Sequence, residues 1–114
     1  MTTTFEALAE PTRRHILDLL RERPRVVGEL VDLLNQSQPL ISKHLRVLRE
    51  VGLVRVRQEA QRRWYALRIE PFVEVDQWFA SYRPLLEERF ERLDTLLSEL
   101  QKQEEDDGEA DTPR

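Results

Sequence analysis

The chain has 114 residues, a formal net charge of −4 at pH 7 and no cysteine. This length suffices for one domain with a modest core, and the lack of cysteine excludes disulfides, thiolate metal sites and cysteine nucleophiles. No apolar run approaches the roughly 18 residues that cross a membrane, and the first residues lack a signal-peptide pattern, so we expect no membrane partner and a cytoplasmic location.

The charge is unevenly distributed along the chain. Residues 101–114 hold six acidic and two basic residues, which account for the whole net charge, because residues 1–100 hold 16 of each sign. An acidic segment without large apolar side chains has nothing to bury in a core. We therefore predict a folded domain over residues 1–100 and an acidic disordered tail over residues 101–114.

Three short helices are predicted in the first third of the chain. Thr4 is expected to cap a helix over residues 5–9, and Pro11 suits the first turn of a second helix that ends near Arg23. Apolar residues at spacings of three and four predict a third helix over residues 27–34.

A fourth helix is predicted over residues 38–51. Ser37 precedes it as an N-cap, and Gly52 follows it at the position that favours a left-handed backbone. The third and fourth helices with the short turn between them have the dimensions of a helix-turn-helix.

A β-hairpin is predicted after the fourth helix. Residues 53–59 alternate apolar and basic side chains, and residues 63–67 read as the partner strand. The connection lacks the glycine that a two-residue turn prefers, so we expect a longer or more mobile loop. Trp64 and Tyr65 are expected to pack against the domain instead of stacking on bases.

The last predicted helix runs from Pro71 to about Leu100. Its apolar residues recur every three or four positions from Val75 onward, a spacing typical of a helix that pairs with another helix. Pro84 should kink or break this helix near residues 80–83.

The helix 38–51 and the hairpin are predicted to bind DNA. Residues 36–68 contain eight basic and two acidic residues, a local charge of +6 that favours contact with phosphates. At about 100° per residue, Ile41, Leu45 and Leu48 share one buried stripe, which leaves the polar side chains on the opposite arc. The predicted DNA-binding residues are Ser37, Gln38, Pro39, Ser42, Lys43, His44, Arg46, Arg49, Arg57, Arg62 and Arg63.

Different roles are expected within this set. Gln38, Ser42 and Lys43 lie early in the helix, where base edges are read in the major groove. Arg46 and Arg49 lie further along and suit phosphates. His44 lies at the edge of the buried stripe and is expected to be a packed, hydrogen-bonded residue or a phosphate contact.

The sequence resembles the arsenic-repressor (ArsR) family of winged helix-turn-helix repressors. The matching segments are LAEPTRRHILDLL (8–20), GEL (28–30), SQPLISKHLRVLREVGLVRVR (37–57) and RRWYAL (62–67). The resemblance implies a mainly α fold with a small β-hairpin and a homodimeric repressor on promoter DNA. It also implies a dimer interface built from the first and last helices, with candidate residues Phe5, Leu8, Phe79, Tyr82, Leu86, Phe90, Leu93 and Leu97.

The chain departs from the metal-sensing members of that family. Those members carry paired cysteines after GEL or a spaced Asp/His set on the last helix, whereas this chain has VDLL at 31–34 and EVDQWF at 74–79. Glu74 and Asp76 point to different sides of a helix, and His15 has no partner at ligand spacing. We therefore expect no metal site and no cofactor, as in the cysteine-free branch that includes metal-independent autorepressors.

Two other classes of function were weighed. An enzyme is not expected, because the chain has no phosphate-binding glycine loop and no nucleophile–base–acid set. A winged-helix module that binds a partner protein through its last helix or acidic tail is the main alternative, and the +6 of residues 36–68 favours double-stranded DNA instead. An effector, if one acts, would be an apolar molecule or a partner protein, and the alternative is control by the amount of the protein alone.

Overall fold

A computed structural model describes residues 1–110 of the chain, and the side chains of residues 1–106. It has two compact units: Met1–Gln77 forms the first, and the second begins at Trp78. The sequence predicted a single folded domain through residue 100, so the division near residue 77 is a difference from that expectation.

Four helices form most of the first unit: α1 (Thr4–Ala9), α2 (Pro11–Glu22), α3 (Val27–Leu34) and α4 (Gln38–Glu50). The hydroxyl of Thr3 accepts a hydrogen bond from the Glu6 N–H at 3.1 Å. Thr3 therefore caps α1, and the prediction of Thr4 as the cap was wrong, because the helix begins one residue earlier and Thr4 is buried. Pro11 is the first residue of α2, as predicted.

The helix-turn-helix consists of α3 and α4 and confirms the prediction. Asn35 ends α3 in a left-handed conformation with φ 53°. The Ser37 hydroxyl accepts a hydrogen bond from the Leu40 N–H at 3.4 Å, which places the N-cap of α4 where the sequence predicted it. Gly52 follows α4 with φ 82°, a conformation that a residue without a Cβ adopts readily.

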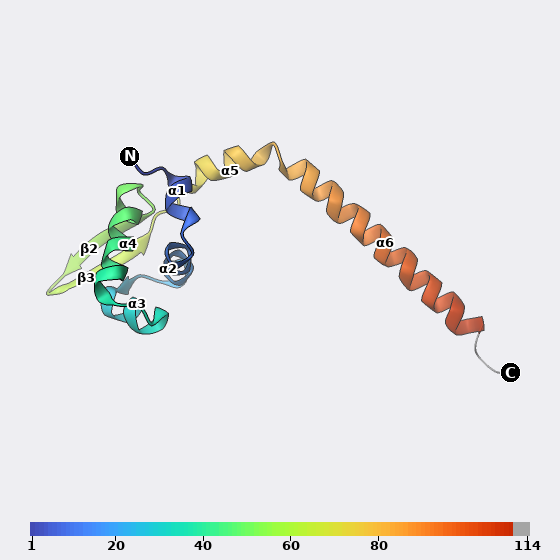
Figure 1. The fold of residues 1–114 in the computed structure, drawn as a ribbon, viewed down its shortest axis with the longest axis horizontal. Coiled ribbons are helices and arrows are strands. Elements are labelled where there is room, and N and C mark those ends of the chain that lie inside the picture. The colour runs from blue at the N-terminus through green and yellow to red at the C-terminus, as the bar shows by residue number, and fades with distance from the viewer. Residues whose placement is uncertain (111–114) are drawn as a thin grey trace. The chain divides into compact units, whose positions relative to one another are not determined.

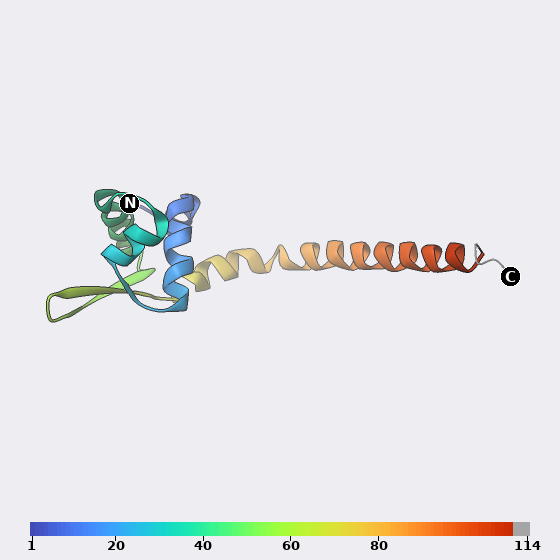
Figure 2. The same ribbon diagram turned by 90° about the horizontal axis from the view of Figure 1, so that it is seen from below.

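A three-stranded antiparallel sheet completes the winged helix-turn-helix. Its strands are β1 (Arg25–Val26), β2 (Val54–Glu59) and β3 (Arg62–Leu67), in the order β1-β3-β2. Figures 1 and 2 show the β2–β3 hairpin projecting beyond the helices of this unit. The strand β1 was not predicted, because two residues are too few to show an alternating pattern.

The hairpin turn is tighter than the sequence predicted. Glu59 pairs with Arg62, so only Ala60 and Gln61 connect the two strands. Ala60 itself adopts the left-handed conformation, with φ 54°, that a glycine would otherwise supply. The expectation of a longer loop was therefore wrong.

The core of the first unit lies between the helices and the inner face of the sheet. Ile41, Leu45 and Leu48 are fully buried and form the inner stripe of α4, as predicted. They join buried side chains from α2, α3, β2 and the residue before β2, including Ile16, Leu20, Leu30, Leu53 and Val54. Tyr65 is buried in the same cluster, which confirms its packing role. Burial of this stripe turns the polar arc of α4 to the surface.

Two further helices follow: α5 (Phe72–Ala80) and α6 (Arg83–Ala110). They are separated at residues 81–82, and Pro84 is the second residue of α6, so the predicted interruption is a break. Among the described residues, none of the helices combines the length and hydropathy of a membrane span.

The C-terminal segment differs from the prediction of a disordered tail. The helix α6 continues through residues 101–110. Gln, Lys and Glu are good helix formers, so the polar residues at 101–105 can extend a helix that begins upstream. Residues 111–114, the end of the predicted tail, lie outside the described residues.

Candidate DNA interface

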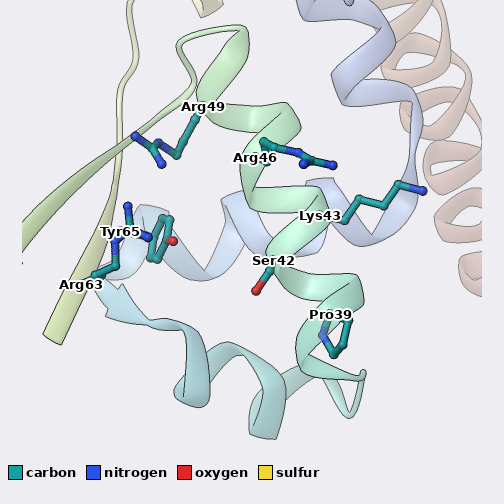
Figure 3. Close-up of a pocket in the computed structure, with 7 residues that line it drawn as sticks. All are labelled: Pro39, Ser42, Lys43, Arg46, Arg49, Arg63 and Tyr65. Carbon is teal, nitrogen blue, oxygen red and sulfur yellow. The ribbon is translucent and has the colours of Figure 1, made fainter.

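An open groove of about 390 Å³ lies between α4 and β3. The residues that line it are Pro39, Ser42, Lys43, Arg46, Arg49, Arg63 and Tyr65. Six of them belong to the set that the sequence predicted to bind DNA, and Figure 3 shows how they are arranged. The fold therefore brings most of the predicted site onto one surface.

The helix contributes one arc of polar side chains to the groove. In Figure 3 Arg49 extends toward the hairpin, whereas Lys43 and Arg46 extend from the other side of α4. Gln38, at the first position of α4, and the capping residue Ser37 are exposed but do not line the groove. The first turns of α4 thus present Gln38, Ser42 and Lys43 to solvent, where a major groove could receive them.

The hairpin contributes one face of β3 to the groove. Successive strand residues point to opposite sides of a sheet, so Arg63 and Tyr65 share the face turned toward α4. Arg57 lines a different hollow, with Pro24 and Trp64, and forms an ion pair with Glu59 at 3.2 Å. The structure therefore separates Arg57 from the groove. Arg62 lies next to the turn and does not line the groove either.

The groove is strongly electropositive. Lys43, Arg46, Arg49 and Arg63 are all exposed, and within the part of the chain whose side chains are described none of them is paired with an acid. Two other arginines of this region are paired with acids, Arg57 with Glu59 at 3.2 Å and Arg68 with Glu70 at 3.6 Å. Four uncompensated positive charges along one groove are suited to a polyanion, and phosphate contacts from such side chains set the register of a protein on DNA.

His44 does not join the exposed arc. Its side chain is buried, with Nδ1 3.4 Å from Arg13 Nη1 and Nε2 3.8 Å from a carboxylate oxygen of Glu10. Burial is the main cause that lowers the pKa of His44; the charges of Arg13 and Lys43 lower it further, and Glu10 opposes the shift. Of the two roles expected for His44, the structure shows the packed, hydrogen-bonded one.

Sequence reasoning did not identify Arg13 as part of this region. Arg13 lies in the first turn of α2 and reaches His44 across 31 positions of sequence. No local pattern indicates such a contact, because it depends on how α2 and α4 pack. Among the described residues there is no group of three or more His, Cys, Asp or Glu side chains that could hold a metal ion.

Comparisons with known proteins agree with this fold. The family described as "Bacterial regulatory protein, arsR family" matches residues 10–56. The transcriptional repressor SdpR of Bacillus subtilis is 30% identical over 82 residues, which cover 72% of this chain and 91% of SdpR. The transcriptional activator HlyU of Vibrio cholerae is 44% identical over 63 residues, or 55% of this chain and 58% of HlyU.

A solved structure extends the likeness to three dimensions. The crystal structure of the ArsR family transcriptional regulator RHA00566 is 36% identical and superposes with a TM-score of 0.64, covering 73% of this chain and 86% of that one. The chain therefore belongs to the ArsR family of winged helix-turn-helix proteins, which are DNA-binding transcription regulators and not enzymes.

Proposed function

We propose that this protein is a homodimeric transcriptional repressor that occupies promoter DNA and does so without a metal ion. The observation that carries the proposal is the groove between α4 and β3, where four exposed cations without acidic partners stand beside the exposed first turns of α4. The relative SdpR, which matches along most of its length, is described as a repressor, and this supports repression over activation.

The roles of the groove residues follow from their chemistry. Lys43 can donate to guanine acceptors, Gln38 can bridge adenine, and Ser42 can serve either a base or a phosphate. Arg46, Arg49 and Arg63 neutralise phosphates and hold the protein in register. Base reading thus belongs to the first turns of α4, and the arginines supply affinity that depends on salt.

A second copy of the chain is the proposed partner of α6. The described apolar side chains of this helix are 40–64% exposed, among them Leu86, Phe90, Leu93 and Leu97. A long helix with an exposed apolar stripe gains most of its stability by burying that stripe against another element. Pairing of two copies would also supply the two half-sites that helix-turn-helix dimers recognise.

The proposal is tested by fluorescence anisotropy on DNA from upstream of the protein's own gene, against scrambled DNA, with EDTA present. We expect tight, sequence-preferring binding that is unchanged by the chelator. Lys43→Ala should weaken binding to the preferred DNA by about 1–3 kcal/mol and leave binding to scrambled DNA nearly unchanged.

The matched control is Arg21→Ala, which removes one exposed positive charge from α2 outside the groove. This variant should weaken binding to the two DNAs slightly and to the same extent. A wild-type protein that does not distinguish the two DNAs, or that needs metal to do so, would contradict the proposal. Equal losses on both DNAs for Lys43→Ala would remove Lys43 from base reading.

A further inference from the structure

Arg13 links three helices of the first unit through a single guanidinium group. Its Nε donates to the carbonyl oxygen of Ala7 at 2.7 Å, and its Nη2 donates to the carbonyl oxygen of Glu6 at 3.1 Å. Its Nη1 lies 3.4 Å from Nδ1 of His44 on α4. This α2 side chain therefore bonds to carbonyl groups at the C-terminal end of α1 and contacts α4, the recognition helix proposed to read the DNA.

The contacts with α1 have a simple cause. A helix leaves its last carbonyl groups without intrahelical partners, and α1 is followed after one residue by α2, so it has no room for a C-terminal cap of its own. Arg13 donates to two of these carbonyl groups, and Arg14 donates to another, that of Leu8, at 2.8 Å. The two arginines share the capping of α1, but only Arg13 continues to α4.

The contact with α4 also has a defined direction. A guanidinium can only donate, so Nδ1 of His44 accepts and the ring proton lies on Nε2, 3.8 Å from Glu10. Glu10 in turn accepts from the backbone N–H of Arg13 at 3.0 Å, which holds the first turn of α2 in place. The planar guanidinium presents its donors in a rigid fork, so the position of His44 relative to the end of α1 is constrained.

We propose that Arg13 is a positioning residue that holds the recognition helix α4 at a set place relative to α1, and thereby determines the half-site spacing that the dimer accepts. The inference rests on the proposed function, in which α4 reads the DNA, and on the dimer interface that the family resemblance implies, to which α1 contributes. In a two-fold dimer any displacement of α4 against α1 occurs in both copies. A helix-turn-helix dimer tolerates little such displacement, because its half-sites lie a fixed number of base pairs apart.

The test begins with a DNA probe chosen by the wild-type protein itself. A two-fold symmetric sequence is selected from a pool of random duplexes, and versions with one base pair added or removed at the centre are made. Wild-type protein should lose about tenfold or more in affinity on either altered spacing. Arg13→Gln should lose less than about threefold, because its two recognition helices are no longer held at one separation.

Three variants separate positioning from a merely structural role. Arg14→Gln removes a neighbouring cap of α1 without touching α4, so it should lower the melting temperature but keep the wild-type preference for spacing. His44→Leu leaves both Arg13 bonds to α1 and removes only the link to α4, so it should loosen the spacing as Arg13→Gln does. His44→Asn keeps an acceptor at the place of Nδ1 and should retain the wild-type preference.

The outcomes are distinguishable. Folded Arg13→Gln and His44→Leu variants that keep the wild-type spacing preference would overturn the positioning role, as would equal loosening by Arg14→Gln. If Arg13→Gln does not fold, His44→Leu decides the question alone. A wild-type protein that selects no two-fold sequence would overturn the proposed function instead, and with it this inference.

Discussion

Arg57 and Arg63 lie on opposite faces of the β2–β3 hairpin. In the antiparallel register Arg57 is paired with Trp64 and Gln58 with Arg63, so the two arginines are one pair apart and their side chains point in opposite directions. Arg63 lines the groove beside α4, whereas Arg57 lies with Pro24 and Trp64 on the other face. Two basic residues that look equivalent in the sequence are therefore placed for different contacts.

This placement predicts different salt dependences for two variants. Arg63→Ala should reduce the slope of log Kd against log salt concentration by about one unit, because one phosphate contact is lost. Arg57→Ala is the matched control, and its effect should be smaller, since Arg57 is already paired with Glu59. Equal changes of slope would mean that both faces of the β2–β3 hairpin contact phosphate.

The apolar stripe of α6 predicts how one charge would affect assembly. Leu93 is 50% exposed in the single chain, and in the proposed dimer Leu93→Asp would bury a carboxylate among apolar side chains. We expect this variant to be monomeric by light scattering at concentrations where the wild type is dimeric. Ser98→Asp adds the same charge about 140° around the same helix and should stay dimeric. A dimeric Leu93→Asp variant would exclude this stripe from the interface.

Glu29 predicts a loss of stability in acid. Burial alone would raise the pKa of Glu29, but hydrogen bonds and charges from Arg23 and Arg25 outweigh burial and lower the pKa. Arg25 is itself buried and donates to Glu29 at 2.7 Å. The carboxyl group of Glu29 therefore binds a proton more readily in the unfolded chain than in the folded one. The stability that ionised Glu29 contributes is full above the ordinary pKa of 4.5 and is lost as the pH falls through the lowered value.

Urea denaturation between about pH 6 and about pH 3 measures this effect. Glu29→Gln should destabilise the protein near pH 6 and flatten the dependence of its free energy of unfolding on pH. Glu50→Gln changes an exposed carboxyl group on α4 and serves as the control. An unchanged dependence on pH in Glu29→Gln would assign the acid sensitivity to other groups.

The hairpin turn predicts a stabilising substitution. Ala60 has φ 54°, a left-handed conformation that is strained for a residue with a Cβ and easy for glycine. Ala60→Gly should therefore raise the free energy of unfolding by about 0.5–1 kcal/mol, measured by urea denaturation. Ala66→Gly, in the middle of β3, should lower it, because glycine weakens a strand interior. A destabilised Ala60→Gly variant would contradict the tight turn.

Features that depend on neighbouring residues could be predicted from the sequence. The polar cap at Ser37 and the glycine at position 52 delimit α4, and the spacing of Ile41, Leu45 and Leu48 identifies its buried side. Pro84 marks the break between α5 and α6 for an equally local reason, since proline removes a backbone donor. These signals were enough to predict the helix-turn-helix and the polar side of α4 that lies at the surface.

Contacts between side chains from distant parts of the chain could not be predicted from the sequence, because they depend on how the elements pack. The strand β1 exists because Arg25 and Val26 pair with Tyr65 and Trp64, and residues so far apart leave no local pattern. The opposite faces of Arg57 and Arg63 depend on a strand register that a shift of one residue would reverse. The contact between Arg13 and His44 depends on the packing of α2 against α4. Such contacts follow from how the core closes, and the core is a property of the whole chain.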